Sequence, residues 1–178
     1  MTRRRLLAMR LCGLAAVMAA GCTYPISKEL RQRAVGGPSF PAALADPEAH
    51  ATATVVWGGV IIQTLNRSDG SDITVLETPL HSGGAPQDPK TSRGRFIAHS
   101  PRFLDPEIYK KGLRITVGGK IVGKATRPLG EIQYHYPVVE AAELYLWPKQ
   151  TDIRYHRPSY HIGFGTWYHP YWGYYHWY

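Results

Sequence analysis

The chain has 178 residues, which is enough for one domain and leaves little for a second. Its 21 Lys and Arg residues against 13 Asp and Glu residues give a formal net charge of +8, which would suit a nucleic acid or an anionic membrane. Both cysteines, Cys12 and Cys22, lie near the start, so the rest of the chain offers no thiol for a disulfide, a metal site or catalysis.

Residues 1–21 have the layout of a secretory signal peptide. A basic start with four arginines and no acid is followed by an apolar run from Leu11 to Ala20. That run is too short to span a membrane, which needs roughly twenty apolar residues. Removing the signal takes away four cations and none of the 13 acids, so the mature net charge falls from +8 to +4. The case for a nucleic-acid partner is therefore weak.

A cysteine directly after the small residues Ala19, Ala20 and Gly21 is typical of a bacterial lipoprotein. Lipoprotein processing attaches diacylglycerol to such a thiol and then cuts before it. We therefore predict cleavage between Gly21 and Cys22, with a diacylglycerol and an N-acyl lipid on Cys22 and no other cofactor. Thr23 follows in place of the Asp that retains lipoproteins in the inner membrane, which favours the outer membrane. The alternatives are an ordinary signal peptide with an unrelated cysteine, or a buried cytosolic helix.

Residues 22–50 are predicted to be a lipidated tether. Proline and glycine punctuate this segment, and no helical or strand period continues over a useful length. A short helix over Ser27–Ala34 is the one element that this segment could hold.

From residue 51 to residue 150 the pattern changes to β. Runs of β-branched and aromatic residues predict strands over 54–65, 73–78, 93–99, 113–123 and 132–147, the last one interrupted near Pro137. The pairs Gly58-Gly59 and Gly118-Gly119 lie inside strands, where glycine usually marks a bulge or a sharp bend. Between the third and fourth strands, Asp105 and Pro106 predict the start of a short helix that ends at Gly112.

Three strands, a short helix and two further strands are the element order of an OB-type barrel. We therefore predict an all-β domain with one short helix, built as a small OB-like five-stranded barrel over residues 51–150. Such a barrel hides its sheet edges without a second sheet. A flat β-sandwich is the alternative fold.

Several stretches of this domain are distinctive. They are Trp57-Gly58-Gly59-Val60-Ile61, Gly94-Arg95-Phe96-Ile97-Ala98, Phe103-Leu104-Asp105-Pro106-Glu107-Ile108-Tyr109, Ile115-Thr116-Val117-Gly118-Gly119 and the region from Glu140 to Trp147. With Cys22, they make the chain resemble the Slp-type outer-membrane lipoproteins, the starvation-inducible, stationary-phase lipoproteins of Gram-negative bacteria. The resemblance implies attachment to the outer membrane and no known catalytic residue. Only Cys22 is carried over from it as a functional position.

Residues 151–178 form an aromatic- and His-rich tail with almost no aliphatic residue, so the tail cannot build a core of its own. Its rings suit a membrane interface or stacking on sugars, and its histidines could take up a transition metal. The histidine spacings are loose, so no metal site is predicted, and a weakly packing segment laid over the barrel is the alternative. The candidate interface or ligand contacts are His156, His161, Trp167, His169, Trp172, His176 and Trp177.

No catalytic residue is predicted, and the protein is interpreted as a non-enzyme. The sequence has no nucleophile elbow, no His-Glu-x-x-His pattern and no phosphate-cradling loop. His81, His99 and His135 are interpreted as surface or hydrogen-bonded histidines. Glu140 and Glu143 would point to opposite faces of a strand and share no reaction centre.

The predicted function is that of a lipid-anchored, periplasm-facing outer-membrane protein with a structural or protective role at the cell envelope. Its expected partner is outer-membrane lipid, with lipopolysaccharide or peptidoglycan as further candidates. No nucleic-acid partner is expected, because the chain is exported. The alternative is an envelope binding module that holds a glycan, lipopolysaccharide or a metal through the barrel face or the tail.

Overall fold

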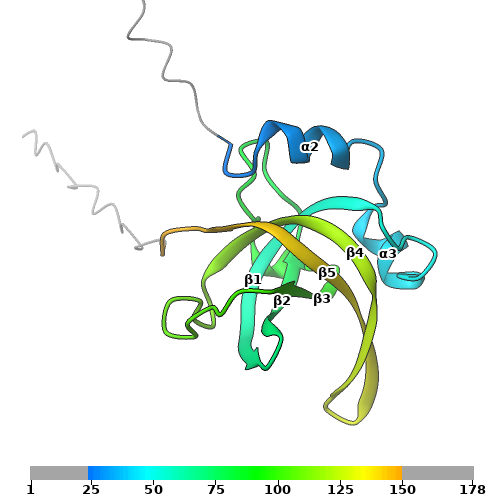
Figure 1. Ribbon diagram of the computed structural model, residues 1–178, viewed down its shortest axis with the longest axis vertical. Helices are drawn as coiled ribbons and strands as arrows, with labels where there is room; N and C mark the ends of the chain where they lie inside the picture. The colour runs from blue at the N-terminus through cyan, green and yellow to red at the C-terminus, as the bar shows by residue number, and fades with distance from the viewer. Residues whose placement is uncertain (1–23, 150–178) are drawn as a thin grey trace, which may run out of the picture.

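The computed structural model describes residues 24–149 as one closed sheet with two helices packed on it (Figure 1). The strands are β1 (Thr54–Arg67), β2 (Gly70–Thr78), β3 (Gly94–Ser100), β4 (Arg114–Leu129) and β5 (Ile132–Leu146). They close into a barrel in the order β1-β2-β3-β5-β4. All neighbours pair antiparallel except β3 and β5, which run parallel from Ile97 opposite Val138 to His99 opposite Glu140. The five predicted strands are confirmed.

The β4–β5 hairpin is longer than the sequence predicted. The two strands pair without a break as far as Leu129 opposite Ile132 and turn at Gly130, which has a φ of +61°. The predicted interruption near Pro137 is wrong, because β5 continues through it. A proline is tolerated there because β5 pairs with β3 only from Val138 onward, so Pro137 lies where the strand has a free edge.

Both glycine pairs lie where backbones come close together. The register of β4 against β5 shifts between Gly118 and Gly119, which confirms the predicted bulge. In β1 the shift against β2 falls between Ile61 and Gln63, beyond the predicted pair. Gly59 serves a different purpose: a Cβ there would overlap the carbonyl oxygen of Leu76 on β2. The absence of a side chain lets β1 and β2 approach each other.

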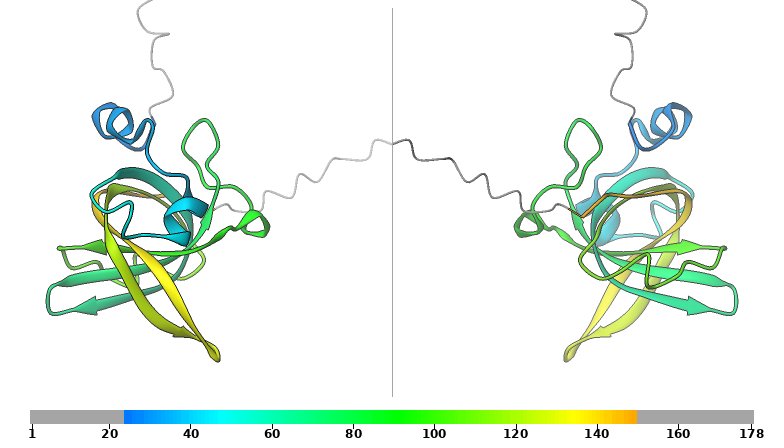
Figure 2. Two further views of the ribbon diagram at one scale, coloured as in Figure 1. Left: turned by 90° about the vertical axis from the view of Figure 1, so that its right-hand side faces the viewer. Right: turned by 90° about the vertical axis from the view of Figure 1, so that its left-hand side faces the viewer.

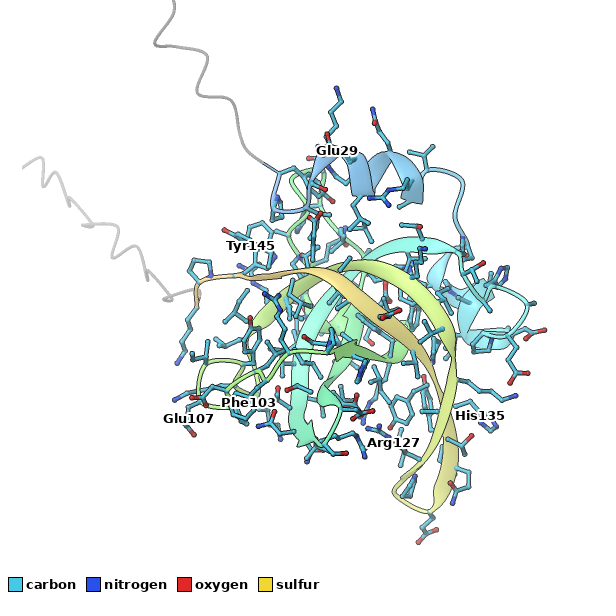
Figure 3. The ribbon with its side chains drawn as sticks, viewed as in Figure 1. Glu29, Phe103, Glu107, Arg127, His135 and Tyr145 are labelled. Atoms are coloured by element: carbon cyan, nitrogen blue, oxygen red, sulfur yellow. The ribbon has the colours of Figure 1, made fainter. Side chains whose placement is uncertain are left out.

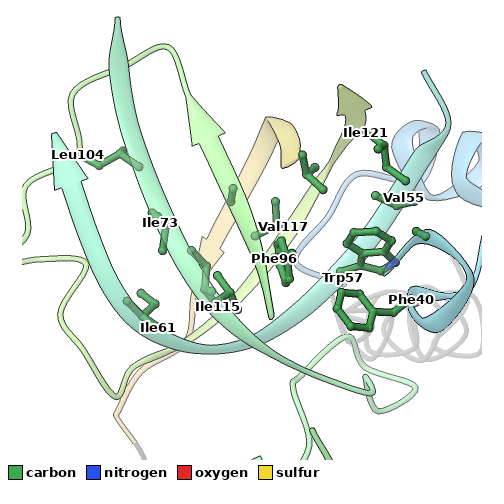
Figure 4. Close-up of a cluster of buried hydrophobic side chains, with 14 residues drawn as sticks. Phe40, Val55, Trp57, Ile61, Ile73, Phe96, Leu104, Ile115, Val117 and Ile121 are labelled. Atoms are coloured by element: carbon green, nitrogen blue, oxygen red, sulfur yellow. The ribbon is translucent and has the colours of Figure 1, made fainter. Parts of the chain in front are cut away.

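Helix α3 (Phe40–Ala45) packs its buried face into one end of the core. Phe40 meets Trp57 edge-on, with ring centroids 5.1 Å apart, and also contacts Phe96 at 6.2 Å. Figure 4 shows Phe40 and Trp57 at one end of this apolar cluster and Leu104 at the other. Aromatic pairs in this geometry add about 0.5–1.5 kcal/mol each beyond the area that they bury.

Helix α2 (Lys28–Ala34) lies across β1 and β4 and buries Leu30. Leu30 and Ile26 occupy the space above Gly118, where a Cβ would collide with them. The described part of the predicted tether, residues 24–50, therefore belongs to the folded domain, and its prediction as a tether is wrong. The helix that the sequence offered over Ser27–Ala34 is present as α2, with Ser27 as its cap. Helix α3, with six residues, was not anticipated because it is too short to show a hydrophobic period in sequence.

The predicted helix over 105–112 is also wrong, because the chain makes only a single turn there. The Asp105 side chain accepts a hydrogen bond from the amide of Glu107, as a helix cap would, and its carbonyl accepts from Tyr109. The turn stops because the Gly112 amide donates to the carbonyl of Ile61, and the Ile61 amide donates to the carbonyl of Leu113. The chain therefore pairs with β1 at this point and does not continue as a helix. Among residues 24–149, both α-helices precede the barrel.

Candidate functional site

The sites predicted from sequence lie at the two ends of the chain. Gly21, Cys22 and all seven candidate contacts of the tail fall outside the described residues. The nearest described residue to the predicted lipid is Tyr24, two positions after Cys22. How the barrel holds Tyr24 therefore decides how an anchor would be joined to the domain.

Tyr24 is packed between a helix and a loop. Its ring fills the space beside Gly84, where a Cβ would collide with it, and Gly84 has a φ of +81°. The guanidinium of Arg31 on α2 lies 4.3 Å from the centre of the same ring. Burial raises the pKa of the Tyr24 phenol, although the positive charge of Arg31 acts in the opposite direction. Tyr24 is therefore in contact both with α2 and with the loop between β2 and β3.

The loop that holds Tyr24 is in turn hydrogen-bonded to the barrel. The Thr116 hydroxyl on β4 donates to the carbonyl of Gly84 over 2.7 Å. The indole N–H of Trp147 donates to the Thr116 hydroxyl over 2.9 Å. Thr116 is fully buried, so both of its bonds are shielded from water. This chain of contacts connects Tyr24 to strand β4 and to the end of strand β5.

Helix α2 is attached to strand β5 through Ser27 and Glu143. The Ser27 amide and hydroxyl both donate to the Glu143 carboxylate, over 2.7 and 2.5 Å. The same hydroxyl caps the helix by accepting from the amide of Leu30. Glu143 thus bonds to α2, whereas Glu140 is exposed. The prediction that the two carboxylates point to opposite faces is wrong: Glu143 pairs with Gly118 and Glu140 with Lys120, so the register shift between them leaves both on the outer face of the barrel.

Replacing Ser27 with alanine removes the helix cap and the hydroxyl's hydrogen bond to Glu143, while the hydrogen bond from the backbone amide to Glu143 remains. We expect a loss of about 2 kcal/mol of unfolding free energy, since a cap contributes about 1 kcal/mol and a bond to a charged group adds to it. Ser39→Ala is the matched control, because Ser39 caps α3 through the Ala42 amide without a carboxylate partner. It should lose about 1 kcal/mol. Urea unfolding measures both, and equal losses would contradict the role of Glu143.

A shallow groove of about 310 Å³ lies between α2 and β1, directly beside Tyr24. Arg31 and Val35 border it on the helix side, and Val56 borders it on the strand side. Val35 is 81% exposed, so the end of α2 presents an apolar side chain to solvent. The groove gathers no pair of acid and base groups of the kind that proton transfer requires.

A match with a family of known proteins covers this region, the predicted lipidation site and the tail. The model of the outer membrane lipoprotein Slp family matches residues 19–178, and so includes Cys22 and the whole tail. The chain belongs to the Slp family. The predicted resemblance is confirmed, and with it the outer membrane as the location of this lipoprotein.

Three curated proteins are similar in sequence to part of the chain. An uncharacterized protein of Haemophilus influenzae is 36% identical over 103 residues, which cover 57% of this chain and 56% of that protein. The uncharacterized lipoprotein YeaY of Escherichia coli is 25% identical and covers 77% of this chain and 70% of its own length. The outer membrane protein Slp of Escherichia coli is 25% identical, with 76% of this chain and 72% of that protein covered.

One solved structure is similar in shape to part of this Slp-family chain. It is a small single-stranded DNA-binding protein from Streptomyces coelicolor, with a TM-score of 0.34 and 10% identity over 53% of this chain and 94% of that chain. A similarity of this size carries no functional argument.

In this Slp-family protein a cluster of charged side chains surrounds Asp72, at the end of the barrel opposite to α2. The buried carboxylate of Asp72 accepts from Arg67 and Arg127 over 2.6 Å each and contacts His99 Nδ1 at 2.9 Å. These contacts join the β1–β2 hairpin to β3 and to the β4–β5 hairpin. His99 thus has a hydrogen-bond partner, as predicted, and so has His135, whose Nδ1 lies 2.8 Å from the Thr126 hydroxyl.

The pKa of Asp72 sets how this cluster responds to acid. Burial alone raises the pKa of Asp72, but hydrogen bonds from His99, Arg127 and Arg67 together outweigh it and hold the pKa below its ordinary value of 3.8. A carboxylate with a lowered folded pKa stabilises the fold above its unfolded pKa. This stability is lost as the pH falls through the folded value.

Asp72→Asn should therefore flatten the acid limb of the stability curve. We expect the variant to be less stable than the parent at pH 7 and to lose less further stability between about pH 4 and pH 2. Asp69→Asn, an exposed position in the turn of the same hairpin, should leave the acid limb unchanged. Thermal unfolding followed by circular dichroism across this pH range measures both. Parallel curves for the parent and Asp72→Asn would contradict the assignment.

Within residues 24–149, no group of three His, Cys, Asp or Glu side chains is placed to hold a metal ion. No helix in the same part of the chain is long and apolar enough to cross a membrane. In the described domain, the arrangement around Tyr24 instead fixes the start of the barrel to the first residues after the predicted anchor. Sequence reasoning missed this arrangement, and the N-cap serine before Lys28 was its only local signal.

Proposed function

We propose that Cys22 carries the lipid of this Slp-family protein, with Gly21 as the last residue of the removed signal. The family match begins at residue 19 and thus includes Ala19-Ala20-Gly21-Cys22, and this observation carries the proposal. A diacylglycerol and an N-acyl chain together supply the two or more hydrocarbon chains that stable anchoring needs, since one chain alone exchanges readily. The barrel then faces the periplasm.

The anchored domain is a barrel of the OB type. Support comes from its five strands, from the antiparallel meander of β1, β2 and β3, and from β5 running parallel to β3 before the barrel closes through β4 and β1. The predicted helix between β3 and β4 is reduced to one turn, and α3 fills one end of the core in addition. The similarity is one of topology and implies nothing about a ligand.

The protein acts as a structural or protective component of the outer membrane, without catalysis, and its synthesis rises in starvation or stationary phase. Support comes from membership of the Slp family and from a described domain whose buried charges are paired with each other rather than gathered in a cleft. Its partner is outer-membrane lipid. A second role, binding of lipopolysaccharide, peptidoglycan or a metal through the tail, rests on tail composition alone, and a pull-down with purified glycan separates it from the first.

Cys22→Ser tests the anchor, with Cys12→Ser as the matched control inside the predicted signal. We expect the parent and Cys12→Ser to fractionate with the outer membrane, and intact-mass measurement should find a lipidated N-terminal cysteine on each. Cys22→Ser should lose all acyl mass and leave the membrane fraction. A Cys22→Ser protein that still carries acyl chains, or a parent that retains residues 1–21, would contradict the proposal.

The protective role has its own test in cells that lack this gene. Stationary-phase cells should admit more of a hydrophobic dye across the outer membrane than the parent strain does. Restoring the normal gene should reverse the leak, and restoring Cys22→Ser should not. Equal dye entry in all four strains would contradict a structural or protective function.

A further inference from the structure

We propose that this barrel lies directly on the phospholipid surface, with its α2 end against the headgroups and its β4–β5 hairpin pointing away. The inference rests on the proposed lipidation of Cys22 and adds an orientation to it. The sequence predicted a tether of residues 22–50, which would have left the orientation free. The structure removes that freedom.

The first step is the length of chain between the lipid and the domain. Only Thr23 lies between Cys22 and Tyr24, and the two Cα–Cα steps of a fully extended chain span at most about 7 Å. The headgroup layer of one leaflet is itself roughly 5–8 Å thick. Tyr24 therefore lies at the membrane surface. A flexible linker over residues 23–50 would instead have spanned about 30 Å.

The second step is that Tyr24 is fixed to the barrel. Its ring is enclosed by Gly84 and Arg31, and α2 is fastened through Ser27 to Glu143 on β5. Leu30 lies over Gly118 and closes the contact with β4. A membrane surface that passes within about 7 Å of Tyr24 therefore lies close to α2 and to the loop that carries Gly84.

The end of the barrel that contains Tyr24 projects away from the β4–β5 hairpin. Figure 2 shows α2 and the loop between β2 and β3 projecting side by side at one end, while the β4–β5 hairpin extends from the opposite end. Figure 3 places Glu29 at the first end and His135 towards the second. With Tyr24 at the surface, the hairpin turn at Gly130 becomes the part of the barrel that reaches farthest into the periplasm.

The third step is the chemistry of that end. Helix α2 carries Lys28, Arg31 and Arg33 against one acid, Glu29, and its Lys28 and Arg33 side chains are exposed. Val35 follows the helix as an exposed apolar residue, and tyrosine is a residue that favours membrane interfaces. Cations suited to phosphate, an apolar side chain and an interfacial aromatic residue together fit an anionic phospholipid surface.

A competing surface exists on the loop between β3 and β4. Phe103 is 71% exposed and Ile108 is 58% exposed, and they are accompanied by Arg102, Lys110 and Lys111. This surface has similar chemistry, but Figure 3 shows Phe103 well away from the end that carries Glu29. Within residues 24–149 no contact holds this surface near the lipid, whereas the short connection through Thr23 holds Tyr24 there.

The test uses the full-length lipidated protein in vesicles of phosphatidylethanolamine and phosphatidylglycerol that contain nitroxide-labelled headgroups. Because the Cys22 thiol carries lipid, a single new cysteine can be labelled with a fluorophore. Gln32→Cys on α2 and Gln133→Cys on the distal hairpin are matched, since both replace an exposed glutamine. We expect the Gln32 probe to be quenched at least threefold more than the Gln133 probe. Equal quenching, or stronger quenching of a Phe103→Cys probe, overturns the orientation.

A second variant separates the short connection from the anchor itself. Twelve Gly and Ser residues inserted after Thr23 should leave the protein bound to the vesicles and should reduce quenching at Gln32 to near the Gln133 level. Unchanged strong quenching at Gln32 overturns the argument from chain length. If the parent does not float with the vesicles at all, the proposed lipidation has failed, and the orientation falls with it. A floating protein with unselective quenching overturns the orientation alone.

Discussion

Phe40→Ala is expected to lower the free energy of unfolding by about 3–5 kcal/mol, the usual cost of deleting a fully buried phenylalanine. Phe40 is 1% exposed and packs edge-on against Trp57 and Phe96, so its removal leaves a cavity where three rings now meet. Domains of this size are stable by only about 5–15 kcal/mol, so the loss is a large part of the total. Urea unfolding followed by tryptophan fluorescence measures it.

Phe103→Ala is the matched control, because the same side chain is deleted at a position that is 71% exposed. It should change the unfolding free energy by no more than about 0.5 kcal/mol. The comparison decides whether residues 24–50 are domain or tether. If Phe40→Ala were as mild as Phe103→Ala, the segment would not contribute to the core, and helix α3 would have no structural role.

Gly59→Ala is the second substitution with a large expected effect. A Cβ at this position would overlap the carbonyl oxygen of Leu76 and meet the Cα of Glu77 at 3.0 Å. These atoms belong to the backbone of β2, in register with β1, so they cannot move aside without breaking strand pairing. Overpacking of side chains costs about 1–3 kcal/mol, and we expect this backbone clash to reach or exceed the upper value. The melting temperature and the soluble yield should both fall sharply.

Gly83→Ala isolates the steric cause, since a Cβ at Gly83 meets nothing within 4 Å. Both variants make the same chemical change, from hydrogen to methyl, and both replace a glycine that has no positive φ. We expect the melting temperature of Gly83→Ala to match that of the parent within about one or two degrees, in line with the small effects of surface substitutions. If Gly59→Ala had the same melting temperature as Gly83→Ala, β1 and β2 would not be packed as closely as the structure has them.

The proposed orientation on the membrane gives the two ends of the barrel different structural roles. In the proposed orientation the end with α2 lies at the lipid surface, while the Asp72 cluster joins the two distal hairpins through Arg67 and Arg127. Truncating one member of a buried, hydrogen-bonded charge cluster leaves the others uncompensated. We therefore expect the contacts between the two hairpins to weaken when Asp72 is protonated or replaced.

The strands, their order and the glycine pairs were predictable because their signals are local. Alternation of β-branched and polar residues follows from the two-residue period of a strand. The turn from Asn66 to Gly70 depends on its own residues and not on the surrounding fold. The lipoprotein signature is equally local, because it is a short chemical pattern around Cys22. Membership of the Slp family confirms the class of protein that this pattern predicted.

The sequence by itself determined the class of protein and the β-rich domain, whereas only the tertiary structure decided how residues 24–50, which follow the predicted anchor, pack on that domain. Leu30 packs against Gly118, and Ser27 is hydrogen-bonded to Glu143, which lies 116 positions away in the sequence. Capping at Asp105 predicted a helix correctly at its first turn, but hydrogen bonds to Ile61 ended it. Local propensities act over a few residues, while burial and long-range pairing depend on strands that the folded barrel alone brings together.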